Sequence, residues 1–208
     1  MKEIKADPLA AAVAALRRGD VIVFPTETLY GLGADALNFS AVEKVFQLKG
    51  RDPNNPFPVL ISDRSMLDLL VATVTPLADK LMRHFWPGPL TLVLPARNDI
   101  PRPLMNSTGG VGVRISSQPI ATAIVSMLGQ PVTATSANPS GQLGAQTLAQ
   151  AQNYFIGRIE VFVDGGTLTS ATGSTVAAVS EREIKMIRAG EISIAQLQNI
   201  VGEGVTIR

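Results

Sequence analysis

Four basic residues stand beside strands and turns in a chain that carries little charge elsewhere. They are Lys49, Arg51, Arg114 and Arg188, and only 17% of all residues are Asp, Glu, Lys or Arg. A charged side chain beside a buried strand costs free energy unless a partner or ligand compensates it. Separated cations near hydroxyl and amide side chains are what a polyanionic small molecule requires. The sequence therefore predicts a phosphate-bearing substrate.

Ser136 and Asn138 supply the nearest such hydroxyl and amide groups. They follow the apolar run PVTAT, which is typical of a buried strand. Both residue types are also ordinary turn formers, so a structural role alone would explain them. A ligand role is favoured because the C-terminal ends of strands in α/β sheets commonly line the binding crevice.

The basic residues have structural explanations too. Lys49 and Gly50 are both favoured at the end of a helix. Arg114 lies in the strand-like run VGVRIS, where an arginine usually faces solvent. The functional alternative makes Lys49 and Arg51 a phosphate clamp, one as a point charge and the other as a bidentate fork. Arg114 would then bind a carboxylate, which matches the same fork geometry.

Composition excludes several other chemistries. The 208 residues include no cysteine and one histidine, His84, so disulfides, thiolate nucleophiles and multi-histidine metal sites are excluded. Lys and Arg total 18 against 17 Asp and Glu, a net charge of +1 that gives no global attraction for nucleic acid or membranes. We assign His84 and Trp86 to structure. No secretory signal or membrane span is apparent, so we expect a cytoplasmic protein.

The glycine-containing loops match neither common nucleotide-binding motif. The glycines of FPTETLYGLGADA do not form G-x-G-x-x-G before a helix, and the run Lys49-Gly50-Arg51 lacks the spacing of a Walker loop.

Helices and strands alternate along the chain without a break in composition, which predicts one α/β domain over residues 1–208. We expect a twisted, mixed sheet with antiparallel parts, flanked by helices. Asp7, Ser40 (in a capping box with Glu43), Thr75, Thr147 and Ser193 are the expected helix caps. Helices are expected at 8–18, 40–49, 65–72, 76–85, 119–128, 147–155 and after 193, and strands at 21–25, 59–62, 90–96, 111–115, 131–135, 159–164, 174–179 and 183–188, with TETLYGLGAD as a loop.

The ordered set of motifs is more specific than any one of them. In chain order these are FPTETLYGLGADA, LKGRDPNNP, WPGPLTLVLPA, VGVRIS, TSANPSG, GSTV and MIRAGEIS, between residues 22 and 193. In these segments the chain resembles the YrdC/TsaC family of L-threonylcarbamoyladenylate synthases. The pairing of Lys49-x-Arg51 with Ser136-x-Asn138 is that family's signature. The chain ends at Arg208, and we expect the short, single-domain form with an open substrate cavity.

The resemblance implies a reaction and a role for each matching residue. Such enzymes condense L-threonine, bicarbonate and ATP into threonylcarbamoyl-AMP and pyrophosphate. The implied threonine ligands are Thr28, Arg114, Ser136 and Ser174. The implied ATP ligands are Lys49, Arg51, Asn55, Asn138 and Arg188, of which Lys49 and Arg51 are the catalytic pair. No protein metal site is implied, and Mg²⁺ is expected to arrive on the ATP phosphates.

The resemblance also implies partners. The product serves the threonylcarbamoyl modification of a tRNA adenosine beside the anticodon, through a downstream threonylcarbamoyl-transferase complex, and tRNA or double-stranded RNA is a further candidate partner. Two positions depart from the pattern: Leu60 stands where long members often have histidine, and Gly110 where a hydroxyl residue often precedes the strand arginine.

Two other functions remain open at this stage. The first is an RNA-binding or regulatory protein of the same fold without synthase activity. The intact set of cations argues against it, because a protein that reads RNA shape has no need of an amino-acid pocket. The second is a carbamoyl-transfer domain like that of hydrogenase-maturation proteins, which carry additional cysteine-containing segments that are absent here.

Overall fold

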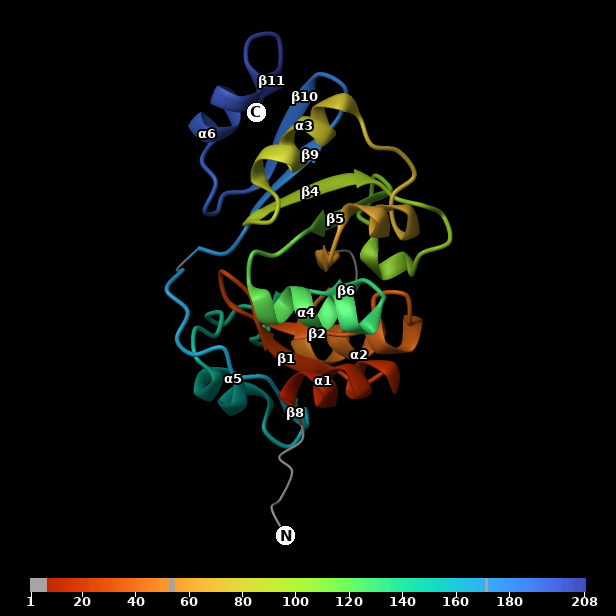
Figure 1. Ribbon diagram of the computed structural model, residues 1–208, viewed down its shortest axis with the longest axis vertical. Coiled ribbons are helices and arrows are strands. Elements are labelled where there is room, and N and C mark those ends of the chain that lie inside the picture. Colours follow the sequence, from red (N-terminus) through yellow and green to blue (C-terminus); the bar gives the residue numbers. More distant parts are fainter. Residues whose placement is uncertain (1–6, 53–54, 171) are drawn as a thin grey trace.

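The computed structural model describes residues 7–52, 55–170 and 172–208 (Figure 1). The helices are α1 (Pro8–Arg17), α2 (Phe39–Lys49), α3 (Pro76–Phe85), α4 (Pro119–Leu128), α5 (Leu148–Phe155) and α6 (Ile194–Val201), with 3-10 helices at Arg64–Leu69 and Arg102–Leu104. The strands are β1 (Ile22–Pro25), β2 (Tyr30–Gly33), β3 (Val59–Leu60), β4 (Leu90–Pro95), β5 (Gly110–Arg114), β6 (Val132–Thr133), β7 (Thr135–Ser136), β8 (Val161–Phe162), β9 (Thr175–Val179), β10 (Glu183–Arg188) and β11 (Thr206–Ile207).

The strands form two mixed sheets. One has the order β7-β2-β1-β8 and the other the order β11-β10-β9-β4-β5-β3-β6. In Figure 1, α3 lies in front of β9 and β10 in the upper part with α6 beside it, whereas α1, α2 and α4 lie around β1 and β2 below. The expected mixed α/β class with flanking helices is confirmed. The strands are divided between two sheets, whereas one sheet was expected.

The chain crosses directly from one sheet to the other at Ala134. This residue separates β6 in the larger sheet from β7 in the smaller one, and its amide N–H donates to the carbonyl of Pro58 at 2.8 Å. The run predicted as one strand over 131–135 is therefore two short strands. Because β7 ends at Ser136, the predicted signature segment begins where the two sheets meet.

Strand β1 is covered on both faces, which explains its unbroken apolar sequence. Ile22 and Phe24 pack in one core cluster with the buried faces of α1 and α4. Val21 and Val23 belong to the other cluster, together with Val42 of α2. Alternate residues of a strand point to opposite faces, so the run VIVFP serves both cores at once.

The start of α2 differs from the prediction. Asn38 is the N-cap, and its side chain accepts a hydrogen bond from the amide of Ala41 at 3.2 Å, so the expected capping box of Ser40 and Glu43 is wrong. The first turn of a helix has backbone N–H groups without a partner in the helix, and Asn38, two residues upstream of Ser40, supplies the side-chain acceptor for one of them. The helix ends as expected at Gly50, whose φ of 58° lies in the left-handed region that favours glycine.

Two further expectations need correction. The segment TETLYGLGAD is not all loop, because Tyr30–Gly33 form β2, which pairs with both β1 and β7. The helix expected over 65–72 is a 3-10 helix at Arg64–Leu69, with Asp63 as its cap. The predicted caps Asp7, Thr75, Thr147 and Ser193 are confirmed.

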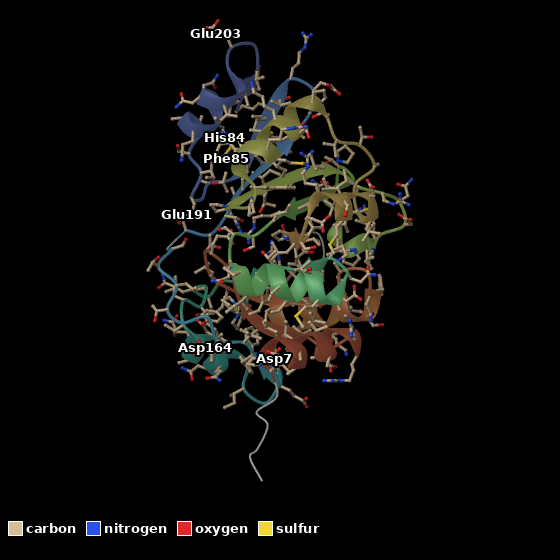
Figure 2. The ribbon with its side chains drawn as sticks, viewed as in Figure 1. Asp7, His84, Phe85, Asp164, Glu191 and Glu203 are labelled. Atoms are coloured by element: carbon tan, nitrogen blue, oxygen red, sulfur yellow. The ribbon has the colours of Figure 1, made fainter. Side chains whose placement is uncertain are left out.

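His84 and Trp86 occupy structural positions at the end of α3. The Trp86 indole is buried and donates to the carbonyl of Leu90 at 2.6 Å, which joins the helix end to β4. The ring of His84 packs edge-on against Phe85 with centroids 4.8 Å apart, and Figure 2 labels both residues, which end α3. Across the described part of the chain, no helix has the length and apolar character needed to cross a bilayer.

Candidate active site

Lys49 holds the predicted signature together. It is the last residue of α2 and is 3% exposed. Its ammonium donates to the carbonyl oxygens of Ser136 at 2.7 Å and Asn138 at 2.9 Å. It also reaches Ser136 Oγ at 3.3 Å and Asn138 Oδ1 at 3.2 Å. The three residues that sequence spacing singled out therefore meet around one ammonium group.

The loop after β7 is folded to bring these groups to the helix end. Ser136 pairs with Gly31 of β2, which fixes the start of the loop. The Asn138 amide donates to the carbonyls of Pro139 and Gln142, both at 2.8 Å, and so closes the loop on itself. The amide of Ser140 donates to the carbonyl of Lys49 at 2.8 Å. Helix α2 and this loop thus form one unit.

A pocket of about 330 Å³ opens at this unit. It contains five of the predicted site residues and is lined by Lys49, Gly50, Arg51, Asp52, Asn55, Ser136, Asn138, Ser140 and Gly141. Asn55 reaches it from an exposed turn, in which its amide donates to the carbonyl of Asp52 at 2.9 Å. Hydroxyl, amide and basic groups therefore converge on a space without a large apolar wall.

Arg51 and Arg188 extend this basic surface. The Arg51 guanidinium lies 5.3 Å from the centroid of Phe57, a cation–π arrangement that supports the side chain. Arg188 donates from Nη2 to the carbonyl of Ser174 at 2.7 Å and to its hydroxyl at 2.9 Å. These bonds join the end of β10 to the start of β9 and bring the predicted residues Ser174 and Arg188 together.

The four cations lie in electrostatic contact in the order Lys49, Arg51, Arg188, Arg114. Burial, then the charge of Arg51, lowers the pKa of Lys49 to about 7. Burial, then the charge of Arg188, lowers the pKa of Arg51. Burial, then again Arg188, lowers the pKa of Arg114 to about 9. The fold therefore gathers like charges that repel one another, an arrangement that an anionic ligand would relieve.

Arg114 differs from Lys49 and Arg188 in that its side chain contacts a carboxylate. Its Nη1 forms a buried ion pair with Glu27, and the other Glu27 oxygen accepts a hydrogen bond from Ser116 Oγ. The ion pair opposes the effect of burial, and Arg114 stays protonated at neutral pH. Sequence reasoning missed Glu27, although a lone carboxylate between Thr26 and Thr28 was a visible signal.

Hydroxyl groups continue from Glu27 toward the larger sheet. Thr28 lies beside Glu27 in a pocket of about 280 Å³, lined by Glu27, Thr28, Pro89, Thr169, Ser170 and Glu191. The Thr28 hydroxyl lies 3.1 Å from that of Thr26, and the Ser174 hydroxyl lies 3.1 Å from that of Thr91. Both predicted hydroxyl residues are buried, at 4% exposure each. The predicted threonine ligands are therefore not all in one pocket. Thr28 lines the pocket of Glu27, Ser136 lines the pocket of Lys49, and Ser174 is bonded to Arg188, whose charge acts on Arg114.

The two departures from the family pattern have different positions. Leu60 of β3 pairs directly with Arg114 of β5, and its side chain is buried in the core cluster of α1 and α4. Gly110 begins β5, at the opposite end of that strand from Arg114. A Cβ there would lie 2.7 Å from the Val93 side chain, so close packing explains the glycine.

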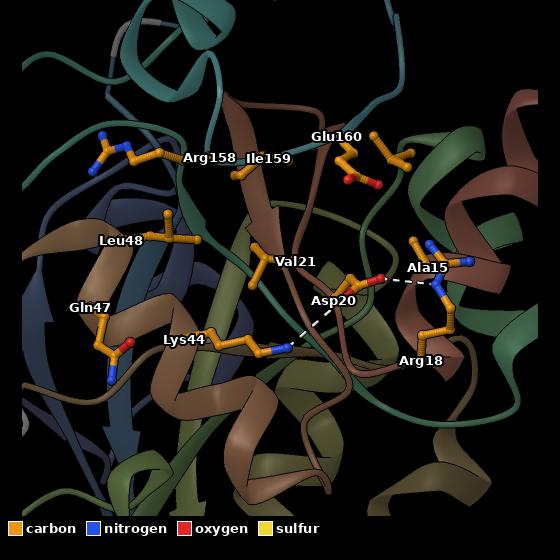
Figure 3. Close-up of a pocket in the computed structure, with 11 residues that line it drawn as sticks. Ala15, Arg18, Asp20, Val21, Lys44, Gln47, Leu48, Arg158, Ile159 and Glu160 are labelled. Carbon is orange, nitrogen blue, oxygen red and sulfur yellow. Dashed lines mark hydrogen bonds and ion pairs between the residues drawn. The ribbon is translucent and has the colours of Figure 1, made fainter.

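A larger pocket, of about 490 Å³, has a different lining, which includes Lys44, Gln47 and Leu48 of α2 (Figure 3). It contains none of the predicted site residues. Asp20 in its wall pairs with Arg18 at 3.0 Å and with Lys44 at 3.8 Å, as the dashed lines in Figure 3 show. We assign the candidate site to the smaller pocket, because it contains five of the predicted site residues. No group of three or more His, Cys, Asp or Glu residues within the described ranges is placed to hold a metal ion.

Comparison with known proteins gives concordant results. A Sua5/YciO/YrdC family model, described as telomere recombination, matches residues 14–190. The threonylcarbamoyl-AMP synthase of Pyrococcus abyssi is 35% identical over 192 residues, covering 92% of this chain and 56% of the relative. That of Bacillus subtilis is 39% identical over 200 residues, covering 94% and 57%.

A solved structure agrees with these relatives. The crystal structure of P. abyssi Sua5 complexed with L-threonine superposes with a TM-score of 0.91 at 34% identity, covering 96% of this chain and 58% of that one. The chain therefore spans a little over half the length of these relatives.

Proposed function

This chain belongs to the Sua5/YciO/YrdC family, and we propose that it is an L-threonylcarbamoyladenylate synthase. The substrates are L-threonine, bicarbonate and ATP, and the products are threonylcarbamoyl-AMP and pyrophosphate. The observation that carries this proposal is the series of four like charges, Lys49, Arg51, Arg188 and Arg114, gathered from separate elements. A polyphosphate beside a carboxylic acid is the ligand combination that such a series fits.

We assign the nucleotide to the end of the series formed by Lys49, Arg51 and Arg188, where the cations outnumber the one carboxylate of the pocket, Asp52. Lys49 and Arg51 would face the phosphates, with Asn55 and Asn138 in the same pocket and Arg188 at its edge. Mg²⁺ would enter bound to the phosphates, because few side chains here suit it as ligands.

We assign threonine to the other end. Arg114 would bind its carboxylate, and the hydroxyls of Thr28, Ser136 and Ser174 would orient the rest of the molecule. The relative crystallised with L-threonine supports this choice of amino acid.

The chemistry requires positioning and charge neutralisation more than acid–base groups. The threonine ammonium loses a proton, and its nitrogen attacks bicarbonate, giving a carbamate and water. A carbamate oxygen then attacks the α-phosphorus of ATP, and the bond to pyrophosphate breaks. Lys49 and Arg51 would stabilise the negative charge that develops on the departing pyrophosphate. This reaction therefore does not require a histidine as a general base in the site.

The product would pass to a threonylcarbamoyl-transferase that modifies a tRNA adenosine. The chain's net charge of +1 offers no general attraction for RNA, so we assign that contact to the later step.

Direct detection of the product tests the proposal. The purified chain is incubated with ATP, isotopically labelled L-threonine, bicarbonate and Mg²⁺, and the mixture is analysed by mass spectrometry. A labelled threonylcarbamoyl adenylate is expected. Its absence from a folded sample that binds RNA would favour the RNA-binding alternative instead.

A further inference from the structure

Glu27 forms the most buried ion pair within the described parts of the molecule. The Glu27 side chain is 14% exposed and that of Arg114 is 4% exposed, and the two residues lie 87 apart in the sequence. Both carboxylate oxygens are engaged, one by Arg114 and the other by Ser116 Oγ. Arg114 Nε is buried without a hydrogen-bond partner. The guanidinium is thus only partly satisfied, and one carboxylate already occupies it.

Glu27 also stands between Arg114 and open space. It lines the pocket of about 280 Å³ together with Thr28, whereas Arg114 is not among the lining residues. A ligand that approaches Arg114 from this pocket therefore meets the Glu27 carboxylate first. It must either share the guanidinium with Glu27 or displace Glu27 from it.

This arrangement disfavours a simple anion. A ligand carboxylate or phosphate at Arg114 would place a second negative charge beside that of Glu27, and like charges that share a site repel each other. An α-amino acid avoids this penalty because it brings an ammonium next to its carboxylate. The ammonium would pair with Glu27 while the carboxylate pairs with Arg114. The exchange leaves no buried charge without a partner.

The opposite end of the series keeps an excess of positive charge, because Lys49, Arg51 and Arg188 outnumber Asp52, the one carboxylate in the lining of the pocket there. The Lys49 ammonium contacts neutral oxygens of Ser136 and Asn138, and Arg188 contacts the neutral oxygens of Ser174. That end suits a polyphosphate, whereas the Arg114–Glu27 end is nearly neutral as a pair. The difference in net charge would direct the polyphosphate and the zwitterionic amino acid to two different places.

We propose that Glu27 is a specificity-determining residue, which admits to Arg114 an acid carrying an α-ammonium and excludes acids without one. The inference rests on the proposed function for the identity of the amino acid, L-threonine. It adds a role for a residue that belongs to neither the predicted threonine set nor the predicted ATP set.

The test compares two ligands that differ by one group. Isothermal titration calorimetry measures the binding of L-threonine and of (R)-3-hydroxybutyrate, which lacks only the α-amino group. The wild-type protein is expected to prefer L-threonine by about tenfold or more, as a charge-assisted hydrogen bond implies. In Glu27→Gln this preference is expected to fall by about ten- to a hundredfold, because the ammonium loses its partner and the bare acid loses its repulsion.

Glu191→Gln is the matched control. Glu191 lines the same pocket but bonds to the hydroxyls of Ser170 and Thr172. It should keep the wild-type preference. Circular dichroism and ATP affinity report whether Glu27→Gln is folded, and the wild-type preference itself can be measured without any variant.

The outcomes separate the inference from the proposed function. If wild type binds no L-threonine, the proposed function fails. If wild type binds both ligands equally, or Glu27→Gln keeps the preference, or Glu191→Gln loses it to the same extent, the role of Glu27 is overturned while the synthase proposal stands.

Discussion

Lys49 Nζ lies 2.9 Å from the carbonyl oxygen of Asn138 and 3.2 Å from its side-chain Oδ1, although the two residues are 89 apart in the sequence. The oxygens of Asn138 and Ser136 that accept hydrogen bonds from this ammonium are all neutral. They orient the positive charge without cancelling it. The same lysine thus fastens helix α2 to the loop after β7 and leaves a positive charge facing the pocket.

Arg51 allows function to be tested apart from stability. The Arg51 guanidinium makes a cation–π contact with the ring of Phe57, so Arg51→Ala should cost only about 0.5–1 kcal/mol of folding free energy. Turnover should fall by about a hundred- to a thousandfold, because charge that develops in the transition state is left uncompensated. Urea unfolding and pyrophosphate release provide the two measurements.

Arg158→Ala is the control for Arg51→Ala. Arg158 lies over Phe155 at the same distance, 5.3 Å, and lines the larger pocket instead. It should lose similar stability and keep its activity. Comparable loss of turnover in both variants would show that Arg51 has no special role.

Lys49 should make nucleotide binding depend on pH. Burial lowers its pKa to about 7, so in the free protein much of it is neutral at pH 8. A polyanion favours the charged form and raises that pKa, so binding should take up as much as about one proton at pH 8. Affinity for ATP should accordingly weaken as pH rises above about 7.

Calorimetry in two buffers with different ionisation enthalpies measures this uptake. Lys49→Arg is the informative variant, because arginine keeps the charge and does not titrate in this range. Equal proton uptake in wild type and Lys49→Arg would assign the proton to another group.

Arg114→Lys should weaken threonine binding much more than ATP binding. Lysine keeps a positive charge for Glu27 but loses the two-pronged geometry that matches a carboxylate. We expect a loss of about 1.5–3 kcal/mol in threonine affinity. Titration of each ligand separately checks this, and an unchanged threonine affinity would make Arg114 a purely structural partner of Glu27.

Tyr30 should contribute to stability through its hydroxyl. This group accepts a hydrogen bond from the amide of Gly165 at 2.9 Å and donates to the carbonyl of Gly166 at 2.8 Å. Tyr30→Phe leaves both partly buried groups without this partner and should cost about 1–3 kcal/mol. Tyr154→Phe is the control, because the Tyr154 hydroxyl makes no hydrogen bond within the described residues. Equal midpoints of chemical unfolding for the two variants would contradict this account.

Local signals in the sequence predicted most of the elements. Thr75, Thr147 and Ser193 are side chains that cap helices through contacts three residues away, and such contacts are visible in sequence. The same signal was misread at Ser40, because Asn38 offered an equivalent acceptor. Tyr30–Gly33 was missed as a strand because its two glycines are typical of a loop, although it pairs locally with β1.

The candidate site, too, has a part that the sequence predicted and a part that it did not. The signature pairing of Lys49 with Asn138 was recognisable as a pattern, and the structure brings these residues into contact. Glu27 was not recognised, since nothing near it in sequence indicates which cation it meets. Its partner is set by how β1, β5 and the turn at Ser116 come together. Long-range electrostatics of this kind require the fold.

Release of pyrophosphate from ATP tests the central claim most directly. The assay compares the complete mixture of protein, ATP, Mg²⁺, L-threonine and bicarbonate with mixtures that lack one of the last two. The account predicts release that requires both L-threonine and bicarbonate. Equal release without threonine, or no release with every substrate present and the protein folded, would contradict it.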